Sequence, residues 1–164
     1  MIPLSLRIAG FLSYLEPAEL DFTRFDLACI SGSNGAGKSS LLDAITWALF
    51  GQARRKDDSI LNNHKKNTAA EVTFIFAYEG NTYRIQRTKP RDKTVLLEYH
   101  IQDADGKWRP LTESTMRATQ ARIIQTLRLD YDTFINASFF LQGKADLFAQ
   151  QNPGDRKKIL SNIL

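Results

Sequence analysis

Apolar and polar residues alternate along several short stretches of the chain, which is the period expected of strands with one buried face. Two of the clearest stretches are separated by Glu79-Gly80-Asn81, so we expect them to form a β-hairpin. The strands predicted from this pattern cover residues 4–8, 18–22, 72–78, 82–87 and 96–101.

Two longer stretches, residues 38–50 and 112–127, carry apolar residues at helical spacing and predict helices. A third helix is expected to begin at Asn152-Pro153, where an N-cap residue precedes a proline at the first helical position. Residues 134–141 are apolar without regular spacing, so no element is predicted there. The apolar stripes of the first two helices are Leu41, Leu42, Ile45 and Leu49, and Met116, Ile123, Ile124 and Leu127.

Residues 31–39, just before the first predicted helix, contain the pattern Gly-x-x-x-x-Gly-Lys-Ser. The apolar stretch 27–30 precedes it and predicts a buried strand, so strand, glycine loop and helix follow in the order that a phosphate-binding P-loop requires. Glycines let backbone N–H groups turn inward around a β-phosphate, and the helix N-terminus adds partial positive charge. Lys38 is expected to reach the β- and γ-phosphate oxygens, and the Ser39 hydroxyl to ligate Mg²⁺. The pattern therefore predicts a nucleoside triphosphate site.

Composition places the chain among ordinary globular domains, with 164 residues and 43% hydrophobic content. The net charge of +4 permits a polyanionic partner without requiring one. Cys29 is the single cysteine and lies in the apolar stretch before the P-loop, so we expect a buried, unreactive thiol and a reducing compartment. No apolar run approaches transmembrane length, and we expect a cytoplasmic protein with no membrane partner.

Hydrolysis of a bound triphosphate needs an acidic residue for Mg²⁺ and a group that orients the attacking water. The nearest candidate for an acidic Walker B element is the apolar run 74–79, but Glu79 opens the hairpin turn and is interpreted as a turn residue. No Leu-Ser-Gly-Gly signature occurs in the sequence. The chain is therefore expected to bind a triphosphate while lacking a complete hydrolytic site.

The sequence around the P-loop resembles that of a known family. The stretch from Asn34 to Ile45, together with Ala48-Leu49-Phe50-Gly51, resembles the N-terminal lobe of the ABC-type head of SMC-like DNA-repair ATPases. These are the SbcC type of bacteria and the corresponding ATPase of archaeal and eukaryotic double-strand-break repair complexes. Further marks of the resemblance are Gly10-Phe11-Leu12-Ser13-Tyr14, Tyr83-Arg84-Ile85 and Phe139-Phe140-Leu141-Gln142-Gly143.

This resemblance implies an α/β fold: a P-loop NTPase lobe of the ABC/SMC-head type, with a mixed sheet, an antiparallel β subdomain and the start of a coiled-coil helix. Residues 1–151 would form the lobe, and residues 152–164 would begin the coiled coil, cut short at Leu164. A C-terminal lobe, on the same or a separate chain, would bring the signature motif and Walker B. Two such heads would close on two ATP molecules, clamp DNA and regulate an SbcD-type nuclease. The location would then be nucleoid-associated in a bacterium or archaeon.

The resemblance also implies roles for individual residues. Gln142 would ligate Mg²⁺ together with Ser39 and lie near the attacking water, because an amide both donates and accepts; Lys38 and Gln142 are thus the candidate catalytic residues. Loop 54–63 would lie near the base and ribose, while Leu12 stands where many relatives carry a basic residue. The candidate ATP-binding residues are Ser33, Asn34, Gly35, Ala36, Gly37, Lys38, Ser39, Ser40, Asn62 and Asn63.

A basic stretch lies on and beyond the predicted hairpin and consists of Arg84, Arg87, Lys89, Arg91 and Lys93. It is equally consistent with a solvated face and with a surface that contacts the DNA backbone. The DNA candidates are Lys89, Arg91 and Lys93.

Two alternatives to the repair ATPase stay open on the sequence. One is the nucleotide-binding subunit of an ABC transporter, although such a subunit is expected to carry its own signature motif. The other is a standalone ATP-binding regulator that does not hydrolyse its nucleotide.

Overall fold

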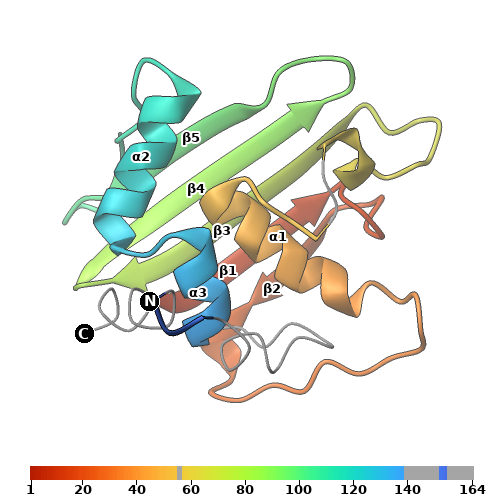
Figure 1. Cartoon of the computed structure of the whole chain (residues 1–164), viewed down its shortest axis with the longest axis horizontal. Coiled ribbons are helices and arrows are strands. Elements are labelled where there is room, and N and C mark those ends of the chain that lie inside the picture. The colour runs from red at the N-terminus through yellow and green to blue at the C-terminus, as the bar shows by residue number, and fades with distance from the viewer. Residues whose placement is uncertain (55–56, 139–151, 155–164) are drawn as a thin grey trace. The chain divides into compact units, whose positions relative to one another are not determined.

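The computed structural model describes residues 1–54, 57–138 and 152–154. The chain divides into two compact units, Met1–Ile123 and Ile124–Leu164. The first is built on a six-stranded sheet of order β2-β1-β3-β4-β5-β6, with helix α1 on one face (Figure 1). The strands are β1 (Ile2–Ala9), β2 (Ala18–Asp21), β3 (Ala69–Tyr78), β4 (Asn81–Pro90), β5 (Leu96–Gln102) and β6 (Trp108–Pro110). The helices are α1 (Lys38–Phe50), α2 (Met116–Leu127) and α3 (Tyr131–Ser138), with short 3₁₀ helices at Phe22–Arg24 and Asp57–Ile60.

The predicted hairpin is confirmed as β3 and β4, which pair from Ala69 opposite Pro90 to Tyr78 opposite Asn81. The two turn residues, Glu79 and Gly80, have φ of 47° and 76°. Two successive positive φ angles are typical of a turn that follows the natural twist of a two-stranded ribbon. Glu79 is therefore a turn residue, as expected, and not part of a Walker B element.

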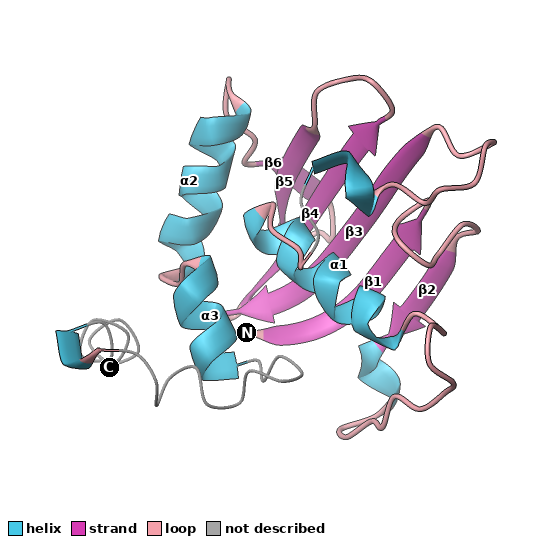
Figure 2. Cartoon of the chain, turned by 45° about the vertical axis from the view of Figure 1, so that its right-hand side comes forward, coloured by secondary structure: helices cyan, strands magenta, loops and turns pink. Residues whose placement is uncertain are grey.

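The core lies between α1 and the sheet face that it covers (Figure 2). Alternate strand residues point into it, and a row of stacked rings crosses the strands from Phe74 through Phe76 and Tyr83 to Tyr99, with centroids 5.4, 5.6 and 5.7 Å apart. Ala44 and Ala48 of α1 are fully buried, and these small side chains allow a close approach of the helix to the sheet. The period-two pattern of the sequence thus sets one apolar face of the sheet.

The buried surface of α1 differs from the predicted stripe. Leu41 and Leu49 are buried as expected, whereas Leu42 and Ile45 are only half-buried. Asp43 and Thr46 are buried instead, and the Thr46 hydroxyl donates to the Asp43 carbonyl over 3.1 Å. The prediction failed here because polar side chains with internal partners occupy part of the buried surface.

The strand predicted at residues 27–30 is wrong. These residues belong to no strand, Leu27 is 91% exposed and Ile30 is 48% exposed. Cys29 is exposed as well, which corrects the prediction of a buried thiol. A strand needs a neighbour for its backbone hydrogen bonds, and the described strands all pair among themselves in antiparallel fashion. The α/β class is confirmed, but the described strands form an antiparallel sheet rather than a mixed one.

The helices that follow the sheet have other bounds than those predicted from the sequence. α2 starts at Met116 rather than residue 112, because the Thr115 hydroxyl accepts from the Ala118 N–H and caps the helix. Residues 131–138 form α3 where no element was predicted, and the Asp130 side chain caps it at the Thr133 N–H over 2.8 Å. Of the predicted α2 stripe, Ile123 and Leu127 are buried, whereas Met116 and Ile124 are exposed.

Arg87 is a buried cation at the C-terminal end of α1. It is 3% exposed, lies on the inner face of β4 and donates from Nε and Nη2 to the Ala48 carbonyl over 3.3 and 3.1 Å. The Gln120 side chain accepts from Arg87 over 2.6 Å and donates to the Leu49 carbonyl over 2.8 Å. Burial lowers the pKa of Arg87 to about 10, so it stays charged at neutral pH. The pair satisfies carbonyls that a helix leaves open at its end.

We expect Arg87→Met to lower the free energy of unfolding by about 2 kcal/mol, because it leaves buried acceptors without donors while keeping the side-chain volume. Urea denaturation measures the difference. The matched control is Arg84→Met on the opposite face of the same strand, where the guanidinium lies 4.6 Å from the centre of the Trp108 ring. Loss of that contact should cost only about 0.5–1 kcal/mol. Equal losses in the two variants would contradict the role given to Arg87.

Candidate nucleotide-binding site

The P-loop has the backbone shape that its glycines predict. Gly32, Gly35 and Gly37 have φ of 148°, 86° and 89°, a region that other residues rarely adopt. α1 begins at Lys38, and its N-cap residue Gly37 makes no side-chain capping hydrogen bond. No side chain therefore caps the start of α1, which leaves the N–H groups of Lys38 and Ser39 for an anion, while the Ser40 N–H donates to the Gly37 carbonyl over 2.9 Å.

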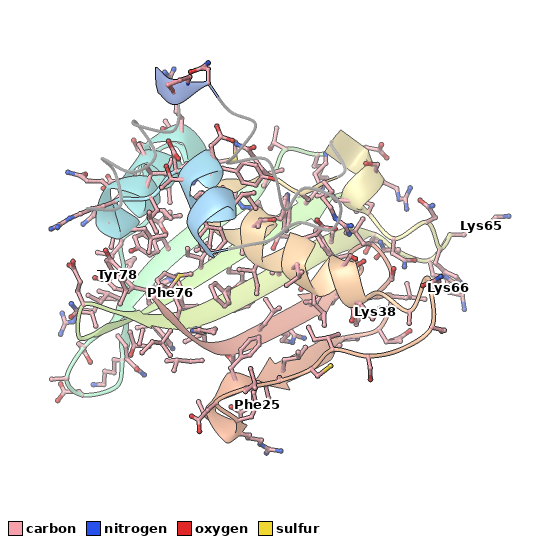
Figure 3. All side chains as sticks on the ribbon, turned by 60° about the horizontal axis from the view of Figure 1, so that its bottom comes forward. Phe25, Lys38, Lys65, Lys66, Phe76 and Tyr78 are labelled. Carbon is pink, nitrogen blue, oxygen red and sulfur yellow. The ribbon has the colours of Figure 1, made fainter. Side chains whose placement is uncertain are left out.

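The Lys38 side chain crosses the P-loop. Its ammonium donates to the carbonyls of Gly32 and Ser33 over 2.7 and 2.8 Å. Figure 3 shows Lys38 at the start of α1, at the end of the molecule opposite Phe76 and Tyr78. This position puts a positive charge over the same loop whose backbone N–H groups would surround a phosphate.

The turn at residues 10–14 packs against the P-loop from the side. The Tyr14 hydroxyl donates to the Gly37 carbonyl over 3.5 Å, and the hydroxyls of Ser13 and Ser40 lie 3.3 Å apart. A Cβ atom on Gly37 would stand 3.1 Å from the Ser13 Cβ, which is a tight contact, and the φ of 89° at this position also favours glycine. Burial raises the pKa of Tyr14, which keeps the phenol protonated as a donor. The turn therefore fixes the start of α1.

A second loop holds this turn in place. The Asn62 N–H donates to the Gly10 carbonyl and the Leu12 N–H to the Ile60 carbonyl, each over 2.8 Å. The Asn62 side chain donates to the Leu12 carbonyl over 2.6 Å and accepts from the His64 N–H over 3.0 Å. Leu12 has a φ of 46°, a strained value for a branched residue that these bonds maintain. Asn62 thus supports the loop beside the P-loop, while the neighbouring Asn63 is exposed.

An ion pair ties the body of α1 to the segment that follows it. The Arg54 guanidinium donates twice to the Asp43 carboxylate, over 2.9 and 2.7 Å, and the Arg54 N–H adds a bond over 3.2 Å. The Asp43 side chain is 5% exposed and that of Arg54 is 42% exposed. Bidentate geometry makes this one of the stronger polar contacts in the chain. It holds the start of the segment predicted to approach the base against the side of α1.

The donor set partly fits a magnesium ion. Ser39 is the second residue of α1 and its side chain is half-buried, so a hydroxyl oxygen is available at the loop, and hydroxyl and amide oxygens suit Mg²⁺. The second predicted ligand, Gln142, lies outside the described residues. Within the described ranges, no group of three or more His, Cys, Asp or Glu side chains is arranged to hold a metal ion.

The predicted basic stretch does not form one surface. Arg84 lies on the outer face of the sheet and Arg87 in the core. Arg91 donates from Nε and Nη2 to the Asn67 carbonyl, both over 3.1 Å, and the Lys89 ammonium donates to the Lys93 carbonyl over 2.7 Å. Of the three DNA candidates, Lys89 thus belongs to the end of β4 and the other two to the loop after it, and two of the three already donate to backbone carbonyls.

Two structural features beside the site were not predicted from the sequence. Lys65 and Lys66 are exposed on the loop that approaches Arg91, and Figure 3 shows them at the same end of the molecule as Lys38. Asn67 is 8% exposed and donates to the carbonyls of Gly10 and Asn62 over 2.9 and 3.1 Å. A pair of lysines is a signal that a search for charge could have found, whereas nothing in the sequence distinguishes Asn67.

Helices in the described part of the chain are all too short or too polar to span a bilayer.

Comparison with known proteins gives the family of the chain. Residues 5–164 match the AAA domain family. The SbcC subunit of an SbcCD nuclease from Deinococcus radiodurans is 32% identical over 99% of the chain, and a DNA double-strand break repair Rad50 ATPase from Thermoplasma volcanium is 35% identical over 100% of it. Both matches cover 18% of the relative's length, so the chain spans under a fifth of these proteins. The alignment with a solved SMC head domain from Thermotoga maritima covers 74% of this chain and 42% of the SMC chain, with a TM-score of 0.46 and 20% sequence identity. The chain therefore belongs to the AAA domain family, and within it to the N-terminal lobes of SMC-like ATPase heads of the SbcC and Rad50 type.

Proposed function

We propose that the chain is the ATP-binding half of a DNA-repair ATPase head. The observation that carries this proposal is the P-loop itself: three positive-φ glycines, an uncapped helix N-terminus and the Lys38 ammonium converge on one loop. Matching relatives are named as an SbcCD nuclease subunit and a DNA double-strand break repair ATPase, which supports the same role. ATP and Mg²⁺ are the ligands that this site would take.

Within the site, the Lys38 ammonium, which donates to the Gly32 and Ser33 carbonyls, would donate to phosphate oxygens when nucleotide binds. The P-loop backbone from Ser33 to Ser40, including Asn34, would surround the phosphates through N–H groups. Ser39 and Gln142 would hold Mg²⁺, which when bound neutralises developing charge on the phosphates. Gln142 would also orient the attacking water, while Asn62 and Asn63 remain candidates for the base side of the site.

A C-terminal lobe is the first expected partner. Three large apolar side chains just before the P-loop are exposed, with Phe25 at 42%, Leu27 at 91% and Ile30 at 48%. Exposed apolar groups of this size gain about 25 cal/mol for each Å² that a partner covers. A strand beside residues 27–30 would cover them and supply the backbone bonds that the segment lacks within the described sheet. This would also bring the Walker B and signature motifs, so the isolated chain should bind ATP with little turnover.

Head dimerisation, an SbcD-type nuclease and DNA complete the proposed assembly, at a cytoplasmic, nucleoid-associated location. A relative supports the nuclease partner, because it is named as a subunit of a nuclease. DNA contact is supported by the cations at the end of β4 and on the loop after it, namely Lys89, Arg91 and Lys93. Such contacts would be phosphate-directed and salt-dependent.

Reversing Lys89, Arg91 and Lys93 to Glu in the full-length gene product should weaken duplex DNA binding and flatten its dependence on salt. Each lost phosphate contact lowers the slope of log K against log salt by about 0.9. Fluorescence anisotropy with a labelled duplex, measured at several salt concentrations in Mg·ATP, gives both quantities.

The control reverses Lys107 and Arg109, which lie by β5–β6 at the end of the sheet away from Pro90. This control should leave the slope unchanged. An unchanged slope in the triple variant would contradict DNA contact at this loop.

A further inference from the structure

α1 carries a single acidic side chain, Asp43, which is buried and lies one helical turn after Ser39. A carboxylate in the interior is costly unless a cation and hydrogen bonds compensate it. The Arg54 guanidinium supplies both, because Nε lies 2.9 Å from Oδ1 and Nη2 lies 2.7 Å from Oδ2 of Asp43. The Arg54 backbone N–H adds a bond over 3.2 Å. The side chain and the main chain of Arg54 are therefore both fixed against α1.

The segment after α1 returns along the helix toward the P-loop. α1 ends at Phe50, yet Arg54 pairs with a residue in the first half of the helix. The short 3₁₀ helix Asp57–Ile60 follows, and its last residue is buried together with Leu61. Leu61 also pairs with Phe11 in an isolated antiparallel bridge. The segment is thus held by Asp43 near its start and by the turn at residues 10–14 at its end.

This turn contacts the segment on one side and the P-loop on the other. The Leu12 N–H donates to the Ile60 carbonyl, and the Asn62 N–H donates to the Gly10 carbonyl. The Tyr14 hydroxyl donates to the Gly37 carbonyl of the P-loop. A nucleoside attached to phosphates at the P-loop has to lie beside the loop, and the segment is one of the elements that these contacts bring there.

We propose that the Asp43–Arg54 pair positions segment 57–63 for the nucleoside part of the bound nucleotide. This rests on the proposed function and deepens it, because the affinity then has two separable sources. The P-loop binds the phosphates, and the segment adds contacts to the ribose and base. Arg54 is a positioning residue, since it acts through the segment.

The test compares Mg·ADP with Mg·pyrophosphate, because the two ligands share a diphosphate but only ADP carries a nucleoside. Titration calorimetry on the full-length gene product gives both Kd values. Asp43→Asn keeps the side-chain volume but loses the charge and the second carboxylate acceptor. It should raise the Kd of Mg·ADP roughly tenfold, the value of one or two neutral hydrogen bonds, and leave that of Mg·pyrophosphate within about twofold.

Two further variants and a control separate the pair from its single members. Arg54→Met should raise the Kd of Mg·ADP as much as Asp43→Asn, and combining the two changes should add little, because the same pair is lost. Arg54→Met leaves a buried carboxylate without its cation, so the double variant, with a neutral amide at position 43, tests the same loss without that cost. The control, Arg24→Met, breaks an ion pair with Asp21 whose side chains are 80% and 44% exposed, and should change neither Kd.

Hydrogen exchange reports on the segment without any ligand. In Asp43→Asn the amides of Leu12 and Asn62, which bond the turn to the segment, should exchange faster. The Gly51 amide, which donates to the Trp47 carbonyl at the end of α1, should keep its rate. Thermal unfolding confirms that each variant is folded.

The pair of ligands distinguishes the possible results. A loss of affinity for Mg·ADP alone supports the proposal. Equal losses for Mg·ADP and Mg·pyrophosphate would show that the pair supports the P-loop as a whole, and unchanged values for both would show that it supports neither; each result overturns the proposal. If the wild-type protein binds both ligands equally well, the nucleoside adds nothing and the proposal fails while the P-loop site stands. If the wild-type protein binds neither ligand, the proposed function fails with it.

Discussion

Replacing Lys38 with alanine is expected to weaken the binding of Mg·ATP to the chain by one to two orders of magnitude. The ammonium lies across the P-loop, 2.7 and 2.8 Å from the carbonyls of Gly32 and Ser33, and is the one charged side chain within the motif. A hydrogen bond to a charged group contributes about 1.5–3 kcal/mol, so the loss should raise Kd roughly 10- to 150-fold. Titration calorimetry on the purified chain measures the Kd of each variant.

Lys107→Ala is the matched control, because Lys107 is exposed on the turn between β5 and β6 and should not change the affinity. The free energy of unfolding should be nearly the same in both variants, since Lys38 is half-exposed and its bonds are on the surface. If Lys38→Ala binds Mg·ATP as tightly as the control, the P-loop is not the nucleotide site.

Gly10→Ala is expected to be the most destabilising single substitution in the turn beside the P-loop. Gly10 has a φ of 60°, and a Cβ there would stand 2.0 Å from the Ala69 carbonyl oxygen and 2.4 Å from the Asn67 side-chain oxygen. The first of these is backbone at the start of β3 and cannot move alone. We expect a loss of about 4 kcal/mol or more in the free energy of unfolding, measured by urea denaturation.

The control for Gly10→Ala is Gly80→Ala. Gly80 has a similar φ of 76°, but a Cβ there would meet nothing within 4 Å. It should cost only about 1–2 kcal/mol, the strain of the backbone alone. The difference between the two variants isolates the steric clash, and similar losses would contradict the packing described around Gly10.

The local pattern of apolar and polar residues was enough to predict most of the strands and the helix after the P-loop. β1, β3, β4 and β5 each alternate apolar and polar residues against one core, and α1 spans Lys38–Phe50 as predicted because Gly37 and Gly51 bound it in the left-handed conformation. The shape of the P-loop followed from the same glycines. In these places local preference and tertiary packing agree.

Other features depend on contacts that a local pattern does not contain. Residues 27–30 have the composition of a buried strand, but strand pairing requires a partner, and none of the described strands lies beside them. Arg87 was grouped with a basic stretch although it follows Tyr83 and Ile85 at period two, which places it on the inner face of β4. That placement could have been predicted from the alternation.

Part of the site could also not be predicted from the sequence. The joining of Arg91 to Asn67 connects residues distant in the chain, and only the fold brings them together. The expectation for Gln142 and the domain boundary at residue 151 stay predictions, because residues 139–151 lie outside the described ranges.

The most direct test of a composite ATPase site is steady-state ATP turnover by the purified 164-residue chain, measured beside its Mg·ATP affinity and beside Lys38→Ala. We expect the wild-type chain to bind Mg·ATP with negligible turnover, because the Walker B and signature motifs are absent from its sequence. Robust hydrolysis by the chain alone, lost in Lys38→Ala, would show that the site is complete without a second lobe and would contradict this conclusion.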